Sequence, residues 1–110
     1  MGRAVSSTWL NDAGRGSGAA SLVDGAKRDR WVWPGDLGIS GLTAYVSTGD
    51  TLSVTNDLNT LFAHQNSAGG LPYAGPPGDV GDIFSDTYHL WTLKAVIDYF
   101  LYSGDRSWVI

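Results

Sequence analysis

Acidic and aromatic side chains crowd into one short stretch of the chain, VDGAKRDRWVWPGD at residues 23–36. Its three carboxylates, Asp24, Asp29 and Asp36, are spaced five and seven residues apart, so a turn before a helix could point several of them into one hollow. Hydrolysis of a glycosidic bond needs two carboxyl groups beside the anomeric carbon, one to protonate the leaving oxygen and one to activate water or attack directly. Trp offers a flat apolar face that suits a sugar ring. The stretch therefore has the residue types of a sugar-cleaving site.

The same residues also have simpler interpretations. Asp36 follows Pro-Gly at an expected helix start, where an N-cap Asp needs no further reason. Arg28 and Arg30 could be solvated partners of the neighbouring Asp residues. Trp31 and Trp33 alternate along the chain, so we expect at least one of them to pack into the core. Taken alone, the cluster favours a solvated turn over a catalytic site.

Composition narrows the possible partners. The chain has 110 residues, 43% of them hydrophobic, which suits one small folded domain. Its 11 acidic residues outnumber its 7 basic residues, and no basic stripe is present, so we expect no nucleic-acid partner. No apolar run reaches the roughly 18 residues of a membrane span, and no secretory signal is visible. We expect no membrane partner, and the compartment stays open.

Two residue types are missing from the chain. It has no cysteine, which excludes disulfides, thiolate catalysis and cysteine-ligated zinc. All its acidic residues are Asp, so any carboxylate chemistry uses the shorter side chain. His64 and His89 fall on different predicted helices without metal-ligand spacing. Asp79 and Asp82 could bind calcium weakly, but a solvated turn is the better interpretation. We therefore expect no metal and no cofactor.

Hydrophobic spacing predicts helices that alternate with loops. Residues 1–22 read as an irregular lead rich in Gly and Ser. Apolar residues at helical spacing predict helices over about 36–47, 51–65 and 86–102, with a fourth starting at 106. Gly38 and Gly41 of the first helix permit close approach of another backbone. A long loop rich in Gly and Pro fills 66–85, with Asp50 and Asp86 as N-caps of the helices that follow them.

The segment 86–102 is apolar around most of its circumference, with Lys94 and Asp98 as its clearest polar pair. Such a helix is expected to be buried on most sides. The junctions STGD at 47–50 and YSGD at 102–105 are similar and lie 55 residues apart, which indicates a repeated helical hairpin. We expect an all-α fold that is a slice of a larger solenoid or toroid, or a protomer that covers its apolar helices with another copy.

Several motifs occur in a recognisable order: DGAKRDRWVWPGD before a helix, then STGD, LPYAGPP, SDTYHLW and YSGD. Over about residues 22–110 this order resembles the catalytic domain of fungal α-L-rhamnosidase-like proteins, the six-hairpin glycosidases of glycoside hydrolase family 78. The resemblance implies that residues 23–110 form antiparallel helical hairpins, a partial segment of an (α/α)6 toroid. It also implies inverting hydrolysis of terminal α-L-rhamnosides by the complete enzyme.

The resemblance assigns roles to individual residues. Asp29 matches the general acid, although bacterial members typically carry Glu there, and the shorter arm must sit closer to the leaving oxygen. Asp24, Arg28 and Asp36 match the residues that hold sugar hydroxyls, and Trp33 matches a wall of the pocket. His89, placed just after the long loop, is expected to reach the pocket rim.

The family's general base is a Glu, and this chain contains no Glu. We therefore expect a glycosidase segment, with carbohydrate as its partner, that is inactive alone. The alternative is a non-catalytic carbohydrate-binding or helical interaction module, which would use the same ligands or self-associate through exposed apolar helices.

Overall fold

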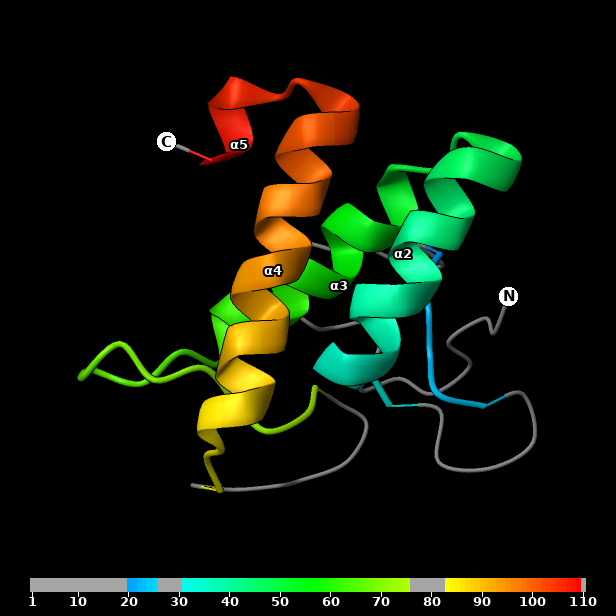
Figure 1. Ribbon diagram of the computed structural model, residues 1–110. Helices are drawn as coiled ribbons and strands as arrows, with labels where there is room; N and C mark the ends of the chain where they lie inside the picture. The colour runs from blue at the N-terminus through cyan, green and yellow to red at the C-terminus, as the bar shows by residue number, and fades with distance from the viewer. Residues whose placement is uncertain (1–19, 26–30, 76–82, 110) are drawn as a thin grey trace.

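The structure is a computed structural model that describes residues 20–25, 31–75 and 83–109. It confirms an all-α fold. Within these ranges four helices follow one another: α2 over Pro34–Thr48, α3 over Leu52–Ala63, α4 over Asp86–Ser103 and α5 over Arg106–Val109 (Figure 1). The extended structure within the described ranges is one isolated antiparallel bridge, between Val32 and Gly75.

Helix α2 begins two residues earlier than the sequence suggested. Pro34 is its first residue and Trp33 its N-cap, because the fixed φ of proline suits the first helical position, where an N–H has no partner in any case. Asp36 lies in the first turn rather than at the N-cap, so the capping interpretation of this residue was wrong. The helix ends at Gly49, which adopts a left-handed φ of 68°.

Helix α3 ends two residues before the predicted boundary at 65. The N–H groups of His64 and Gln65 donate to Leu61 and Phe62 at 3.2 and 3.1 Å, so the last turn tightens and the α-helical pattern stops. At the other end, an Asp50 carboxylate oxygen accepts the Ser53 N–H at 3.0 Å. Asp50 thus satisfies a free N–H of the first turn, although Thr51 is the formal N-cap.

Helix α4 is capped by Ser85, whose hydroxyl accepts the Tyr88 N–H at 3.5 Å. The expected cap, Asp86, is instead the first helical residue. Gly104 ends the helix with a φ of 68°. Asp105 then opens α5, because one of its carboxylate oxygens accepts the Trp108 N–H at 3.2 Å. The fourth helix therefore begins at 106 as predicted.

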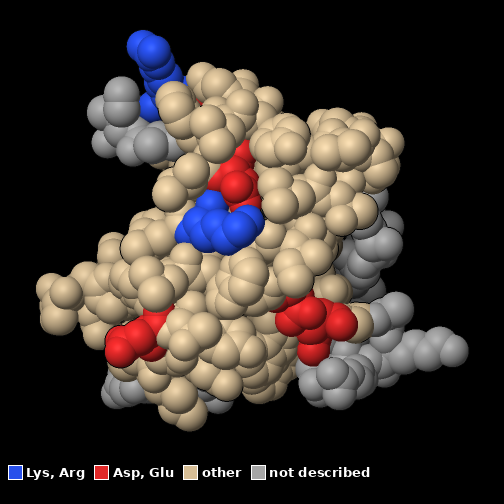
Figure 2. Space-filling model, viewed as in Figure 1, with Lys and Arg blue, Asp and Glu red and all other residues tan. Residues whose placement is uncertain are grey.

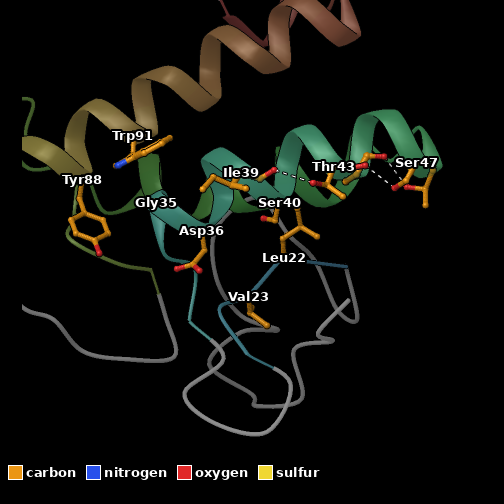
Figure 3. A pocket seen from close by; sticks show the side chains of 12 residues that line it. Leu22, Val23, Gly35, Asp36, Ile39, Ser40, Thr43, Ser47, Tyr88 and Trp91 are labelled. Atoms are coloured by element: carbon orange, nitrogen blue, oxygen red, sulfur yellow. Dashed lines mark hydrogen bonds between the residues drawn. The ribbon is translucent and has the colours of Figure 1, made fainter.

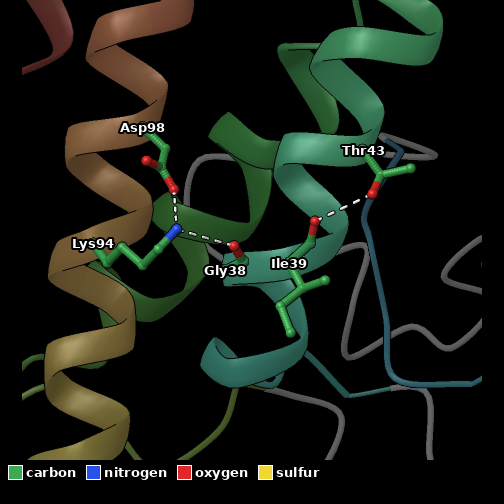
Figure 4. A network of polar contacts seen from close by, with 5 residues as sticks. All are labelled: Gly38, Ile39, Thr43, Lys94 and Asp98. Carbon is green, nitrogen blue, oxygen red and sulfur yellow. Dashed lines mark hydrogen bonds and ion pairs between the residues drawn. The ribbon is translucent and has the colours of Figure 1, made fainter.

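Close packing of α2 against α4 organises the molecule, and the two helices lie side by side in Figure 1. Gly38 makes this possible, because a Cβ atom there would lie only 2.4 Å from Cε3 of Trp91. The Lys94 ammonium reaches across to the Gly38 carbonyl at 3.2 Å and to an Asp98 carboxylate oxygen at 2.5 Å (Figure 4). Gly38 thus does permit a close approach, but of the Trp91 side chain rather than of another backbone as expected.

The core lies between α2, α3 and α4, and its fully buried members include Leu37, Val54, Leu58 and Leu61. The segment 20–25 is part of it, since Leu22 is buried. An Asp57 carboxylate oxygen accepts the Leu22 N–H at 2.9 Å, and the Asn56 side chain donates to the Ala20 carbonyl at 2.8 Å. The C-terminal end of the expected irregular lead is thus fixed to α3.

Helix α4 is buried on one side only, which corrects the expectation of burial on most sides. Its buried residues are Thr92, Ala95 and Tyr99, while Leu90 and Ile97 are 63% and 58% exposed. The physical reason is the number of neighbours: among the described elements, only α2, α3 and the short α5 pack against α4. No helix in the described ranges is both long enough and apolar enough to cross a bilayer.

Candidate functional site

A groove of about 750 Å³ runs along α2 (Figure 3). One wall is a face of α2 from Gly35 to Thr48, and the segment 20–25 contributes Leu22 and Val23. Helix α4 closes one end with its first turns. The described lining combines a carboxylate, hydroxyls, aliphatic side chains and aromatic rings, which is the composition of small-molecule sites.

Asp36 and Tyr88 supply the polar groups at the α4 end of the groove. Asp36 lies in the first turn of α2, where the partial positive charge of the helix terminus favours a carboxylate. Partial burial raises the pKa of Tyr88, and the nearby Tyr73 hydroxyl and Asp36 carboxylate raise it further. The Tyr88 hydroxyl therefore keeps its proton at neutral pH and can donate a hydrogen bond beside a carboxylate that can only accept.

Trp91 forms the aromatic part of the same end. Its ring packs over Gly35 and Gly38 of α2, and the Lys94 ammonium lies 5.7 Å from its ring centroid. The indole is only partly buried and lines the groove. It can therefore receive an apolar ligand face while its position is held by α2.

Asp24 forms hydrogen bonds with the backbone of Trp31. One of its carboxylate oxygens accepts the Trp31 N–H at 3.0 Å, and the Asp24 N–H donates to the Trp31 carbonyl at 3.2 Å. Asp24 does not belong to the groove lining that contains Asp36. Arg28 and Asp29, the predicted sugar ligand and general acid, lie outside the described residues. The structure thus places Asp36, of the predicted ligands, on the groove.

Trp33 belongs to an aromatic cluster beside the groove, made of Trp31, Trp33, Tyr73 and Tyr88. The two indoles are stacked with ring centroids 5.6 Å apart, and Tyr73 meets Trp33 edge-on at 5.2 Å. Neither indole is fully buried; the residue between them, Val32, is. The expectation that one Trp enters the core was therefore wrong, because the alternation places Val32 in the core and leaves both rings partly buried beside it.

His89 lies next to Tyr88 in the sequence but serves another contact. Its Nδ1 accepts the Leu71 N–H at 3.3 Å, so in the neutral ring the proton is on Nε2. The side chain holds the loop after α3 and is not among the groove lining. Tyr88 and Trp91, three residues apart, occupy the helix face that points to the groove, and only that spacing could have indicated them.

Acidic and histidine side chains are spread over the described part of the chain. It contains no group of three or more His, Asp or Glu side chains that could hold a metal ion. No family model matches the sequence, and no curated protein matches it. The resemblance to six-hairpin glycosidases thus stays a prediction from the quoted motifs.

Proposed function

We propose that this chain is a segment of an α-L-rhamnosidase-like glycosidase domain and that its groove binds carbohydrate. The observation that supports the proposal is the meeting of the Asp36 carboxylate, the Tyr88 hydroxyl and the Trp91 ring at one end of the groove. A carboxylate accepts hydrogen bonds from sugar hydroxyls, a phenol hydroxyl donates to them, and an indole receives the C–H face of a ring.

Within this proposal the other motif residues keep separate roles. Asp29 is the general acid of the complete enzyme, and Arg28 holds a sugar hydroxyl. Asp24 acts through the backbone of Trp31, which it fixes by two hydrogen bonds two residues before Trp33, the N-cap of α2. Because the chain contains no Glu, it lacks the residue type that the family uses as general base. We expect it to bind sugar without hydrolysing it.

The test is titration with L-rhamnose, followed by the backbone and indole N–H signals in NMR spectra. We expect shifts at Tyr88 and Trp91, and Asp36→Asn should weaken binding about tenfold or more, as loss of a charged hydrogen-bond acceptor does. Asp86→Asn is the matched control, because Asp86 also lies in the first turn of a helix but outside the groove lining. Equal affinity of the two variants would refute the proposed role of the groove. A chromogenic α-L-rhamnoside should give no turnover with the chain as it stands.

A second candidate, a helical interaction module, is favoured by the outward stripe of α4. We define this stripe as Leu90, Leu93, Ile97 and Leu101, which follow the three- and four-residue spacing of a packing seam and are all exposed. The face of the molecule shown in Figure 2 carries few charged groups. An exposed apolar stripe of this kind marks an association surface.

The partner we propose for the stripe is a second copy of the chain in antiparallel orientation. Exposed Asp86 lies at the start of α4 and exposed Arg106 follows its end, so a two-fold axis through the middle of the helix would bring each acid toward the partner's base. Light scattering over a range of concentrations tests this. A chain that stays monomeric at every concentration would exclude it.

A further inference from the structure

Beyond Asp36 the groove continues along α2, and this part has its own chemistry. Ser40, Thr43 and Ser47 follow Asp36 at intervals of four, three and four residues, so all four side chains lie on one face of the helix. Figure 3 shows them along the groove. From Asp36 to Ser47 the helix rises about 16 Å. The row is therefore much longer than the region where Asp36, Tyr88 and Trp91 meet.

Two hydroxyls of this row, those of Thr43 and Ser47, are set up as hydrogen-bond acceptors. The Thr43 hydroxyl donates to the Ile39 carbonyl at 3.3 Å, and the Ser47 hydroxyl donates to the Thr43 carbonyl at 2.7 Å. Each has thus used its one proton within the helix and keeps lone pairs for a ligand. Because the Asp36 carboxylate also only accepts, a ligand must supply donors to Asp36, Thr43 and Ser47, whereas the Ser40 hydroxyl can donate or accept.

The side of the groove opposite the row is apolar, and the described lining carries negative but no positive charge. Leu22 and Val23 line that side, and Ile39 adds apolar surface on α2 itself, so a ligand needs C–H surface as well as hydroxyl donors. Among the described lining residues Asp36 is the one charged side chain and none is Lys or Arg, so this part of the groove would repel a carboxylated or sulfated ligand. Hydroxyl donors alternating with C–H faces, and no negative charge, are properties of a neutral oligosaccharide.

We infer that the row Ser40, Thr43 and Ser47 is an extended subsite for further sugar units, so that this groove selects uncharged oligosaccharides over monosaccharides and over acidic sugars. The inference rests on the proposed carbohydrate function and adds the substrate class. The Asp36 end binds the terminal sugar, and the hydroxyl row accepts hydrogen bonds from the units that follow it.

The experiment compares three probes by NMR titration and calorimetry: L-rhamnose, a neutral linear rhamnose trisaccharide, and a galacturonic acid trisaccharide. We expect the neutral trisaccharide to bind about tenfold more tightly than the monosaccharide, because two or more added hydrogen bonds contribute that much. The acidic trisaccharide should bind no more tightly than L-rhamnose.

The double variant Thr43→Val with Ser47→Ala removes acceptors without removing the helix. It should abolish the gain of the trisaccharide and leave L-rhamnose affinity unchanged. Thr55→Val is the matched control, because the Thr55 hydroxyl makes the same bond to the carbonyl four residues earlier, at 2.8 Å, but on α3 and outside the groove lining. Thermal unfolding followed by circular dichroism establishes that each variant folds.

The outcomes separate the two proposals. If L-rhamnose binds in an Asp36-dependent manner but the trisaccharide gains nothing, or the double variant keeps the gain, the extended subsite is wrong and the proposed function stands. Tighter binding of the acidic trisaccharide would also overturn the subsite. If no probe binds, both proposals fail.

Discussion

The two faces of α4 have similar hydrophobicity but different surroundings. On the inward face, Trp91 inserts over Gly38 and Ala95 is buried. On the outward face, Leu90, Ile97 and Leu101 are 63%, 58% and 70% exposed. The difference lies in the neighbouring element: α2 presents glycines where α4 approaches, whereas the described part of the chain presents nothing to the outward stripe. Apolar character gives a helix surface that can be buried, and a partner of matching shape determines which part is buried.

The largest effect on stability is expected at Gly38, where the inward face of α4 packs most closely against α2. Gly38→Ala places a Cβ atom 2.4 Å from Trp91, too close for any real contact, so the helices must separate or the ring must move. Overpacking of this kind lowers the free energy of unfolding by about 1–3 kcal/mol. We expect a net loss near the middle of that range, measured by urea unfolding followed by circular dichroism.

Gly41→Ala is the matched control, one turn further along α2. A Cβ atom there would lie 3.4 Å from the Val54 side chain, close to ordinary contact. The gain in helix propensity, about 0.5–1 kcal/mol, should then be retained. The two variants should have opposite signs, and equal destabilisation by both would show that Gly38 has no special role in the α2–α4 contact.

A smaller effect on stability, which depends on pH, is expected where Tyr99 of α4 contacts Asp105 at the start of α5. Hydrogen bonds from the Ser107 side chain and from the Tyr99 hydroxyl hold the pKa of Asp105 below its usual value. Because the folded pKa is lowered, this stabilisation is complete well above the ordinary Asp pKa of about 4. It is lost as pH falls through the lower, folded value.

We therefore expect α5 to detach in acid before the rest of the molecule unfolds. The indole N–H of Trp108 donates to Asn59 at 2.7 Å, so its NMR signal reports this contact. Tyr99→Phe should move the transition to higher pH, because one hydrogen bond to the carboxylate is lost. A Trp108 signal that follows global unfolding at every pH would contradict the expectation.

Much of the fold follows from local sequence signals. Gly49 and Gly104, the glycines of the STGD and YSGD junctions, end α2 and α4 with positive φ, because left-handed backbone is open to glycine and strained for most other residues. The helix starts were less predictable. Asp36 and Asp86 were the candidate N-caps in the sequence. In the structure Pro34 is the first residue of α2, and Ser85 caps α4.

The groove was harder to predict than the helices. Asp36 stood out because it is charged and near aromatic residues, but Thr43 and Trp91 look like ordinary helix residues in the sequence. Which face of α2 meets which face of α4 depends on packing between segments about 50 residues apart, and hydrophobic spacing within either helix carries no information on it. The contact of Asp57 with Leu22, 35 residues earlier, was missed for the same reason.

The smallest effect on stability is expected from a substitution on the outward face of α4. Ile97→Lys should change the free energy of unfolding by no more than about 0.5 kcal/mol, because an exposed side chain loses no packing. If the stripe joins two copies, the same substitution should abolish concentration-dependent association in light scattering, since it puts two like charges into an apolar seam. Val46→Lys should leave association intact, because Val46 is even more exposed than Ile97 but lies on α2. A large loss of stability in Ile97→Lys at concentrations where the chain is monomeric would mean that the outward face is packed within one chain, and the contrast between the faces of α4 would disappear.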